Sequence, residues 1–463
     1  MNAPVSAIEQ LLLELPDLDW ITDESRVTRL SSDFSWFSPV LVRQLKDKRA
    51  DVVVRPRTEE EIRAVVGACA RRGVPITIRG SGTGNYGQTT PLAGGVVLDM
   101  TGYNGCLWVR PGVARAQAGI RLGELEKQTK STGQELRCVP STYRSATLGG
   151  LFGGGFGGVG SINYGPLGAP GNVIGIRAMT IEAEPQFVEL RGADAMRMHH
   201  LWGTNGLVLE LEIALAPAHP WLETLVTFGD FESALHFADK LAHAPGIVKR
   251  GVTFFAAPIS DHLAQLAAHL PKGCHTVLSL VAESSESAML QLVEAHGGTV
   301  GYRKTAAEVQ KSNRTLMEFT WNHTTLHALK IDPNLTYLQS GFVPGRHVEQ
   351  VIEMEKLLGG KAGERGEVMM HLEFLRNVSG LMTCSGLQLV RFSTEERLQE
   401  IMRIHREHGV HINNPHVNIV EDGKAGGPLP PEVIEVKKRF DPLGLLNPGK
   451  LRDWPVKAGA AAV

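Results

Sequence analysis

In the first hundred residues, short runs of hydrophobic residues predict strands, and a longer stretch of mixed hydrophobic and polar residues between two of them predicts a helix. Residues 51–56 (DVVVRP) and 74–79 (VPITIR) read as short buried strands. Between them Thr58-Glu-Glu-Glu61 is a capping box, which predicts a helix that begins there and ends near Gly73. A further strand is expected over 96–100 (VVLDM). This order places strands and helices in alternation from the start of the chain.

The middle of the chain has a different pattern. Residues 231–242 have helical periodicity, 275–281 read as a strand, and helices and strands continue to alternate. This favours a second domain of mixed helices and strands. Pro217 and the loop-rich stretch 421–431 (EDGKAGGPLPP) mark its ends. The predicted segments are a first domain over 1–217, a second over 218–425, and a C-terminal segment over 426–463.

A glycine-rich stretch follows the second predicted strand. Residues 79–88 read RGSGTGNYGQ, and Gly82, Gly84 and Gly87 form the G-x-G-x-x-G pattern of dinucleotide-binding loops. In a Rossmann fold such a loop opens a crossover helix. Here only eight residues, Pro91 among them, lie between Gly87 and the next predicted strand, whereas a crossover with its helix needs at least about 10–12. We therefore interpret the match to the Rossmann pattern as accidental.

What remains is a strand, a tight glycine loop and a strand. Successive backbone N–H groups in such a loop form a nest for an anion, and glycines let a pyrophosphate lie directly on the backbone. The alternative is a glycine-rich hairpin turn. Ten residues with four glycines exceed what a hairpin requires, so the pattern favours a phosphate-binding loop.

The composition of the chain argues against some classes of binding partner and cellular location. The 463 residues suffice for two or three domains. Lys and Arg number 47 against 49 Asp and Glu, and the net charge of -2 argues against nucleic acid or an anionic membrane as partner. The five cysteines form no C-x-x-C pair, which favours reduced thiols and a cytoplasmic location. The N-terminus reads as an amphipathic helix rather than a signal peptide, and we expect no integral membrane segment.

Two further motifs give the glycine loop a context. Residues 140–175 run PSTYRSATLGGLFGGGFGGVGSINYGPLGAPGNVIG, and 439–451 run RFDPLGLLNPGKL. Together with RGSGTG, and in this order, they resemble the FAD-linked oxidases of the vanillyl-alcohol oxidase/p-cresol methylhydroxylase (PCMH) fold. Within that fold the chain is most similar to the branch that contains D-lactate dehydrogenase and glycolate oxidase. The similarity covers roughly 50–217 and 438–451 well and the middle only loosely.

The resemblance implies an α+β architecture with a two-part FAD-binding domain and an inserted α+β substrate (cap) domain. Residues 79–87 would hold the FAD pyrophosphate, and residues between Pro140 and Gly165 would line the ribityl chain and the isoalloxazine. Gly203–Gly206 and Ile213 would reach the adenine end, and the NPGK segment would return near the flavin. The residues carried over are Arg79, Gly80, Ser81, Gly82, Thr83, Gly84, Asn85, Gly87, Gln88, Pro140, Ser141, Thr147, Gly149, Gly150, Gly154, Gly158, Ser161, Tyr164, Gly165, Gly206, Ile213, Asn447 and Lys450.

Three positions depart from the family's pattern. Thr83 stands where relatives that bind flavin covalently through this loop have His, so we expect non-covalent FAD unless a cap-domain residue forms the link. Gly154 stands where the acceptor loop often has Asn. The G-D-G-N-x-H-like metal segment of the hydroxy-acid branch is missing, and the nearest string, 414–423 (NPHVNIVEDG), matches poorly. We therefore predict no metal.

The chemistry of an alcohol substrate suggests candidate residues in the second domain. The hydroxyl proton must be removed, typically by His near neutral pH. The pair His323 and His327 is spaced i, i+4 and would share a helix face, but no third metal ligand accompanies it. For each candidate taken singly, an ordinary structural role is the alternative. The full set of catalytic candidates is His323, His327, His371, His416, Arg391 as a carboxylate anchor, and Tyr337 as a donor.

The sequence therefore predicts an FAD-dependent oxidoreductase that takes hydride from a CH–OH group of a small hydroxy acid or alcohol. An oxidase or dehydrogenase of a phenolic alcohol or amine is one alternative. An FAD-carrying electron-transfer subunit of a larger complex is another, and a flavin-binding protein without redox turnover is a third. The electron acceptor (O2, a quinone or a carrier protein) and the oligomeric state, a homo-oligomer included, stay open.

Overall fold

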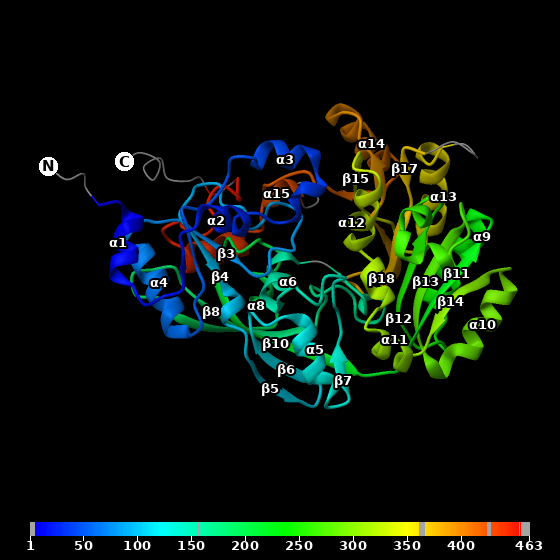
Figure 1. Cartoon of the computed structure of the whole chain (residues 1–463), viewed down its shortest axis with the longest axis horizontal. Helices are drawn as coiled ribbons and strands as arrows, with labels where there is room; N and C mark the ends of the chain where they lie inside the picture. The colour runs from blue at the N-terminus through cyan, green and yellow to red at the C-terminus, as the bar shows by residue number, and fades with distance from the viewer. Residues whose placement is uncertain (1–4, 156, 361–365, 424–426, 453, 455–463) are drawn as a thin grey trace.

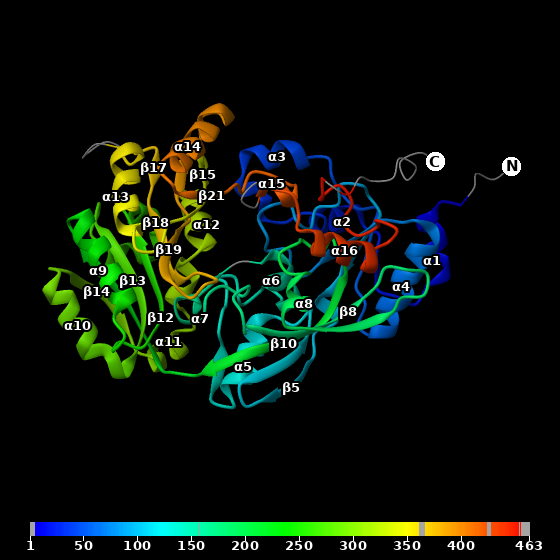
Figure 2. The same ribbon diagram turned by 180° about the vertical axis from the view of Figure 1, so that it is seen from behind.

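The computed structural model describes residues 5–155, 157–360, 366–423, 427–452 and 454. Two halves lie side by side (Figure 1). The N-terminal elements, from blue through cyan to blue-green, make one half, and the green to yellow elements with part of the orange ones make the other. The red C-terminal segment returns to the N-terminal half, as the view from behind also shows (Figure 2).

A small sheet opens the first half. Its strands follow the order β1-β2-β4-β3, with β2 and β3 each parallel to β4. The crossover helix α4 begins where expected, because the Thr58 hydroxyl accepts from the Glu61 N–H at 3.2 Å, and it ends at Gly73 in a left-handed conformation. The Glu61 carboxylate bonds the N–H of Arg57 rather than that of Thr58. The bounds are α1 (Ala7–Glu14), β1 (Trp20–Ile21), α2 (Glu24–Leu30), α3 (Pro39–Leu45), β2 (Val52–Val54), α4 (Glu59–Arg72), β3 (Ile76–Arg79) and β4 (Val96–Asp99).

A second sheet completes the first half. It is antiparallel, with β10 at its centre between β6 and β8. The helices α6 and α8 contact it and lie between it and the small sheet (Figure 1). The bounds are β5 (Cys106–Arg110), β6 (Val113–Gln117), α5 (Leu122–Lys130), β7 (Gln134–Leu136), α6 (Leu148–Gly154), α7 (Ser161–Tyr164), β8 (Val173–Met179), β9 (Phe187–Arg191), α8 (Ala193–Met196) and β10 (Leu207–Pro217).

The second half is built on an eight-stranded antiparallel sheet. Its order is β14-β11-β13-β12-β18-β19-β16-β21, and a three-stranded sheet, β15-β20-β17, stands beside it. The bounds of its strands are β11 (Trp221–Phe228), β12 (Lys249–Phe255), β13 (His275–Ala282), β14 (Thr299–Lys304), β15 (Leu335–Tyr337), β16 (Gln339–Gly341), β17 (Val368–Met369), β18 (His371–Arg376), β19 (Met382–Gly386), β20 (Leu389–Arg391) and β21 (His411–Asn413).

The two faces of this large sheet pack differently. Helices α9 and α13 share an apolar core with one face, on the side away from the first half (Figures 1 and 2). On the other face, Phe255, Leu278 and Leu280 belong to the same core as Leu148 and Phe152 of α6. A continuous core therefore joins the two halves. The helices are α9 (Phe231–His243), α10 (Glu286–Ala295), α11 (Ala306–Ser312), α12 (Asn322–Ile331), α13 (His347–Leu358) and α14 (Glu395–Glu407).

The C-terminal segment returns to the first half. It contains α15 (Val420–Gly423) and α16 (Pro431–Phe440). Leu446 pairs with Ile76 at the edge of β3 as an isolated parallel bridge, and the Val420 N–H donates to the Lys450 carbonyl at 2.9 Å. The predicted boundary at 425/426 falls at residues outside the described ranges, and both domain boundaries stay predictions.

Two properties of the described residues bear on the expectations above. All five cysteines are free thiols, four of them buried. Within the described ranges the structure contains no helix that combines the length and the apolar character needed to traverse a lipid bilayer.

Candidate functional site

The glycine loop joins two parallel strands without a helix. β3 and β4 pair in parallel register from Ile76–Val96 to Arg79–Asp99, and residues 80–95 between them contain no helix or strand. Parallel pairing rules out the hairpin turn, which needs antiparallel strands. The missing helix rules out the Rossmann crossover. The loop thus joins the two strands through irregular backbone.

The loop is packed tightly from behind. A Cβ added at Gly80 would lie 2.1 Å from the Thr147 hydroxyl, and one added at Gly84 would lie 2.0 Å from the Gln88 amide oxygen. At Gly82, which has a φ of +68°, a Cβ would meet the Arg79 guanidinium at 2.0 Å. A side chain at Gly80 would therefore clash with Thr147, one at Gly82 would be strained by the positive φ, and one at Gly84 would require the flexible Gln88 side chain to move.

On its open side the loop borders a cleft whose empty space amounts to about 870 Å³, part of which is open solvent. Eleven of the predicted cofactor residues line it: Gly80, Ser81, Gly82, Thr83, Gly84, Gln88, Thr147, Gly149, Gly150, Gly154 and Gly206. Eleven other residues complete the lining: Ile78, Thr89, Met100, Ala118, Phe152, Gly153, Met198, Trp202, Gly203, Asn205 and Val208.

Helix α6 forms one wall of this cleft. Thr147 caps it, because its hydroxyl accepts from the Gly150 N–H at 3.1 Å. A Cβ at Gly149 would lie 2.7 Å from that of Ala118, so this position requires glycine for packing. At Gly153 and Gly154, by contrast, a Cβ would find no atom nearer than 3.9 and 3.8 Å. These two glycines leave space in the cleft rather than filling it.

Three polar side chains near the loop donate hydrogen bonds to backbone carbonyls. The Lys450 ammonium is fully buried and donates to the Gly87 carbonyl at 2.8 Å. The Asn447 amide donates to the carbonyls of Gln88 and Trp202 at 2.8 and 2.9 Å. Arg79 donates to the Ser32 carbonyl at 2.6 Å. The C-terminal segment therefore fixes both walls of the cleft through backbone carbonyls.

Burial disfavours the charges of these residues. It lowers the pKa of Lys450 to about 7, and the nearby Asp33 carboxylate opposes that effect. Burial lowers the pKa of Arg79 as well, again against the charge of Asp33. Burial likewise raises the pKa of Asp33, whose carboxylate accepts from the N–H of Ser35 at 2.9 Å.

Residues 157–165, which we call the second glycine segment, lie mainly against the other half. Helix α7 packs on β12 and β18, and the Gly160 N–H donates to the Arg250 carbonyl at 2.7 Å. A Cβ at Gly158 would lie 2.2 Å from the Val139 carbonyl, and one at Gly157 would lie 2.6 Å from the Trp321 ring. Predicted cofactor residues that do not line the cleft are Arg79, Asn85, Gly87, Pro140, Ser141, Gly158, Ser161, Tyr164, Gly165, Ile213, Asn447 and Lys450.

Sequence reasoning missed the wall formed by 198–202. Met198 and Trp202 line the cleft, and Trp202 stacks near Tyr86 with ring centroids 5.5 Å apart. His200 and Trp202 both have positive φ, 57° and 54°, which is rare for bulky residues and concentrates at functional sites. No local sequence signal marks such a backbone.

None of the six catalytic candidates lines the cleft. His416 is buried and uses both ring nitrogens, 2.8 Å from the Ser38 hydroxyl and 2.9 Å from the Tyr337 carbonyl. Burial lowers the pKa of His416 to about 4. The Tyr337 hydroxyl is buried and has no partner in the described part of the chain, and Arg391 pairs with Asp332 at 2.7 Å. The structure thus places His416 and Arg391 in contacts of an ordinary structural kind.

The His323 and His327 pair on α12 is half-buried. The His327 ring stacks on Phe319 with centroids 4.6 Å apart and lies 3.1 Å from the Glu318 carbonyl. Burial, reinforced by His327, lowers the pKa of His323 to about 4. The pair belongs to no cluster of three or more potential metal ligands within the described ranges.

His371, at the start of β18, belongs to a buried network that reaches the second glycine segment. Its Nε2 lies 3.0 Å from the Glu373 carboxylate, and its Nδ1 has no hydrogen-bond partner among the residues that the structure describes. Glu373 also accepts from the Trp321 N–H at 2.6 Å and from the Thr253 hydroxyl at 2.7 Å. Trp321 in turn borders Gly157. Among the candidates, His371 is linked in this way to the segment assigned to the flavin.

Comparisons with known proteins agree with this geometry. Residues 50–185 match the model of an FAD binding domain family. An uncharacterised FAD-linked oxidoreductase of Mycobacterium tuberculosis is 31% identical over 200 residues, which are 40% of this chain and 42% of that protein. The chain thus matches about two fifths of the length of this relative. The glycolate oxidase subunit GlcD of Escherichia coli is 25% identical over 428 residues, 86% of this chain and 83% of that one.

A solved structure gives the fold independently. Alkyldihydroxyacetonephosphate synthase superimposes with a TM-score of 0.70 at 16% identity, covering 97% of this chain and 86% of that chain. At this identity the likeness concerns the fold alone.

Proposed function

Since residues 50–185 form an FAD-binding domain of the PCMH type, we propose that the whole chain is an FAD-dependent oxidoreductase acting on the CH–OH group of a small hydroxy acid or alcohol. The observation that carries the proposal is the glycine-lined cleft beside the 80–95 loop. Similarity to a glycolate oxidase subunit over most of both chains supports a hydroxy acid as the substrate class.

The residues of the cleft fit FAD. Glycines 80, 82 and 84 bring bare backbone to one wall, and Gly153 and Gly154 keep the facing wall free of side chains. Behind the cleft lining, two buried polar atoms, Asn85 Nδ2 and Asn447 Oδ1, have no hydrogen-bond partner in the described ranges. Under this proposal the 80–84 backbone holds the pyrophosphate, and 147–154 lines the ribityl chain and the ring.

When bound, FAD supplies a hydride acceptor at its N5 atom. We assign the substrate's hydroxyl proton to His371, because its Nδ1 is unpartnered while Glu373 holds its Nε2. A carboxylate in that place fixes the tautomer with the proton on Nε2, so that Nδ1 is the free acceptor. The packing of α7 on β18 brings this strand to the segment assigned to the flavin.

Non-covalent binding is part of the proposal. Thr83 lines the cleft at the position where some relatives of this fold have a linking His, and a threonine hydroxyl offers no comparable nucleophile. The cleft is open to solvent, so the cofactor has a route in and out.

A second candidate function has one specific observation in its favour. GlcD of Escherichia coli, which is similar to this chain over most of the length of both proteins, is named a subunit of glycolate oxidase. The chain would then act with partner subunits that carry electrons onward. A chain that acts alone would reduce a small acceptor dye with substrate, whereas a subunit would show reduction of its flavin by substrate without multiple turnovers.

Anaerobic titration tests the proposed function. The flavin-loaded protein is mixed with each of a panel of 2-hydroxy acids, aliphatic alcohols, phenolic alcohols and amines, and the flavin absorbance is followed. We expect a hydroxy acid or aliphatic alcohol to bleach it. Bleaching by a phenolic alcohol or amine alone, or by dithionite but none of the panel, would contradict the proposal.

A further inference from the structure

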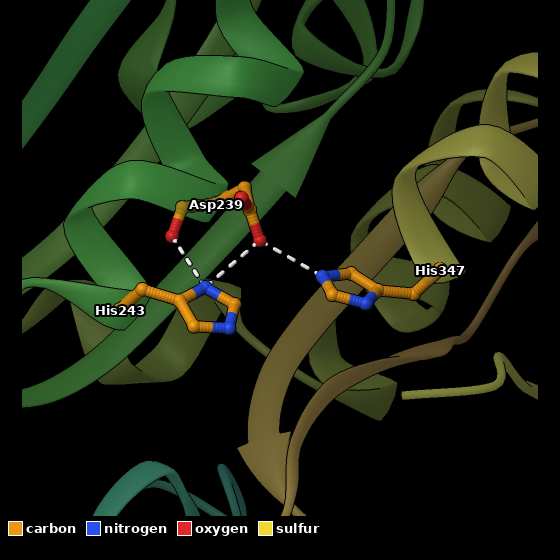
Figure 3. Close-up of side chains that lie close together, drawn as sticks. All are labelled: Asp239, His243 and His347. Carbon is orange, nitrogen blue, oxygen red and sulfur yellow. Dashed lines mark hydrogen bonds and ion pairs between the residues drawn. The ribbon is translucent and has the colours of Figure 1, made fainter. Parts of the chain in front are cut away.

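A cluster of three metal-ligating side chains lies far from the cleft, on the outer helices of the second half. Asp239 and His243 are one turn apart on α9, and His347 is the first residue of α13 (Figure 3). The Asp239 Oδ1 lies 3.0 Å from His243 Nδ1 and 2.8 Å from His347 Nε2. One ligand atom from each residue lies within 4.8 Å of the other two.

The arrangement of the rings brings both histidines to the same carboxylate. The His243 and His347 rings are nearly parallel, at 18°, with centroids 5.8 Å apart, and Figure 3 shows a nitrogen of each ring turned toward Asp239. His347 is buried, with 4% of its surface exposed. Two imidazoles and one carboxylate are one of the sets of three protein ligands that zinc takes in open sites, with water as the fourth ligand.

The site is reachable from solvent. His243 is exposed, and it lines an open cleft together with Pro245 and Lys249. Helices α9 and α13 contact each other and share a core with the large sheet. An ion bound between them would therefore join two helices of the second half without touching the glycine-lined cleft.

We propose that Asp239, His243 and His347 bind one divalent transition-metal ion of the zinc type, with water completing a tetrahedral site. The ion replaces the proton now shared between Asp239 Oδ1 and His347 Nε2, and His243 turns from the Asp239 carbonyl, 3.0 Å away, to face the ion. Metal–nitrogen and metal–oxygen bonds of about 2.0–2.2 Å fit between groups at these separations after small side-chain rotations. The three residues are not among those we assign to the flavin or the substrate.

The alternative is a hydrogen-bonded triad that binds no metal. Both alternatives agree with the lowered pKa of Asp239. Burial alone would raise this pKa, but the hydrogen bond from His347 and the nearby His243 lower it by more. The two alternatives differ in what added zinc does. Because the ligands must be deprotonated, the metal site also predicts a zinc affinity that weakens as the pH falls.

Zinc competition with a chromophoric chelator tests the proposal on the tag-free, flavin-loaded chain. We expect the wild type to take up one equivalent of Zn²⁺. His347→Gln and Asp239→Asn should weaken this uptake at least about tenfold, and His243→Gln gives a third variant at an exposed position that the fold tolerates. His236→Gln, on the exposed face of the same helix, is the matched control and should bind as the wild type does.

The flavin spectrum and the melting temperature without metal show whether each variant is folded. Zinc should raise the melting temperature of the wild type and of His236→Gln but not of the three ligand variants. No zinc uptake by the wild type, or equal uptake by folded ligand variants, would overturn the proposal and leave the hydrogen-bonded triad.

Discussion

Single residues decide whether the cleft has room for a flat anionic ligand. Gly153 and Gly154 lie on α6 at the cleft wall, and a Cβ there would meet nothing nearer than 3.8 Å. Gly80, Gly82 and Gly84 answer the opposite need, because a Cβ there would strike Thr147, Arg79 or Gln88. Glycine thus leaves the cleft open on the α6 wall and allows close packing in the 80–84 loop.

Gly154→Leu should abolish flavin binding while the chain stays folded. Leucine is favoured over glycine in a helix, and its side chain would occupy cleft volume rather than protein interior. We expect at least about a hundredfold loss in FAD affinity, since the ligand would lose a wall of its site. FAD uptake by the refolded apoprotein measures it. Gly229→Leu, at an exposed glycine with nothing within 4 Å, should keep normal uptake; normal uptake by Gly154→Leu as well would contradict the assignment.

Lys450 makes a prediction about pH. Burial lowers the pKa of Lys450 from 10.5 to about 7 in the folded, flavin-free chain. Between pH 7 and 10.5 the Lys450 side chain is therefore protonated to a greater extent in the unfolded chain than in the folded one. The stability of the wild type should therefore rise with pH across this window, by up to about 1.4 kcal/mol per unit. Lys450→Met removes this dependence. Urea unfolding from pH 7 to 10 measures it.

The exposed variant Lys272→Met is the control for that series and should follow the wild-type curve. If Lys450→Met and the wild type show parallel pH dependence, then the ammonium is not held in a low-dielectric site under Gly87, and the account of the C-terminal segment fails.

His371→Asn should slow the reduction of flavin by substrate by roughly 10²- to 10⁴-fold, the usual contribution of a general base, with FAD still bound. Stopped-flow absorbance under anaerobic conditions gives the rate. His405→Asn removes an equally buried imidazole, on α14 beside Gln388, and controls for loss of packing. Equal rates in the two variants would remove His371 from the reaction.

At the scale of elements, β18 and α12 are tied together through one carboxylate. Glu373 accepts from the Trp321 N–H, the Thr253 hydroxyl and the His371 ring. Trp321 precedes α12 with a φ of +50°, a conformation that costs energy for a bulky residue. The carboxylate fixes this backbone turn and the ring together.

Glu373→Gln should therefore destabilise the chain. An amide has one acceptor oxygen in place of two, so at least one buried donor loses its partner at a cost of about 1–3 kcal/mol. The midpoint of urea unfolding measures this. Glu124→Gln, on the exposed face of α5, should stay within about 0.5 kcal/mol of the wild type. A midpoint for Glu373→Gln that matches this control would refute the role of the carboxylate.

Elements with local signals could be predicted from the sequence. The Thr58 cap and the left-handed Gly73 delimit α4, and the absence of a helix after Gly87 follows from the eight residues and the proline that precede β4. The parallel pairing of β3 with β4 could not be predicted, because register between strands depends on contacts distant in sequence. The 198–202 wall was missed for a similar reason, since its positive φ values are imposed by packing rather than by glycine.

At the scale of the whole molecule, the chain returns to its starting half to complete the site. Asn447 and Lys450 donate to the loop carbonyls of Gln88 and Gly87, which lie 359 and 363 residues away in sequence. The FAD-binding domain predicted from spaced motifs is confirmed by the family match over 50–185, and the PCMH-type fold by the structural likeness over 97% of the chain. The substrate and the assignment of His371 stay predictions, because no motif of the second half is specific enough to identify them.

The visible spectrum of the purified chain, repeated on the supernatant after acid precipitation, tests the central claim most directly. We predict a flavin spectrum that moves entirely to the supernatant, as expected for FAD held without a covalent bond at Thr83. Flavin that stays with the pellet would contradict non-covalent binding. A colourless protein that takes up no added FAD would contradict the cofactor site itself.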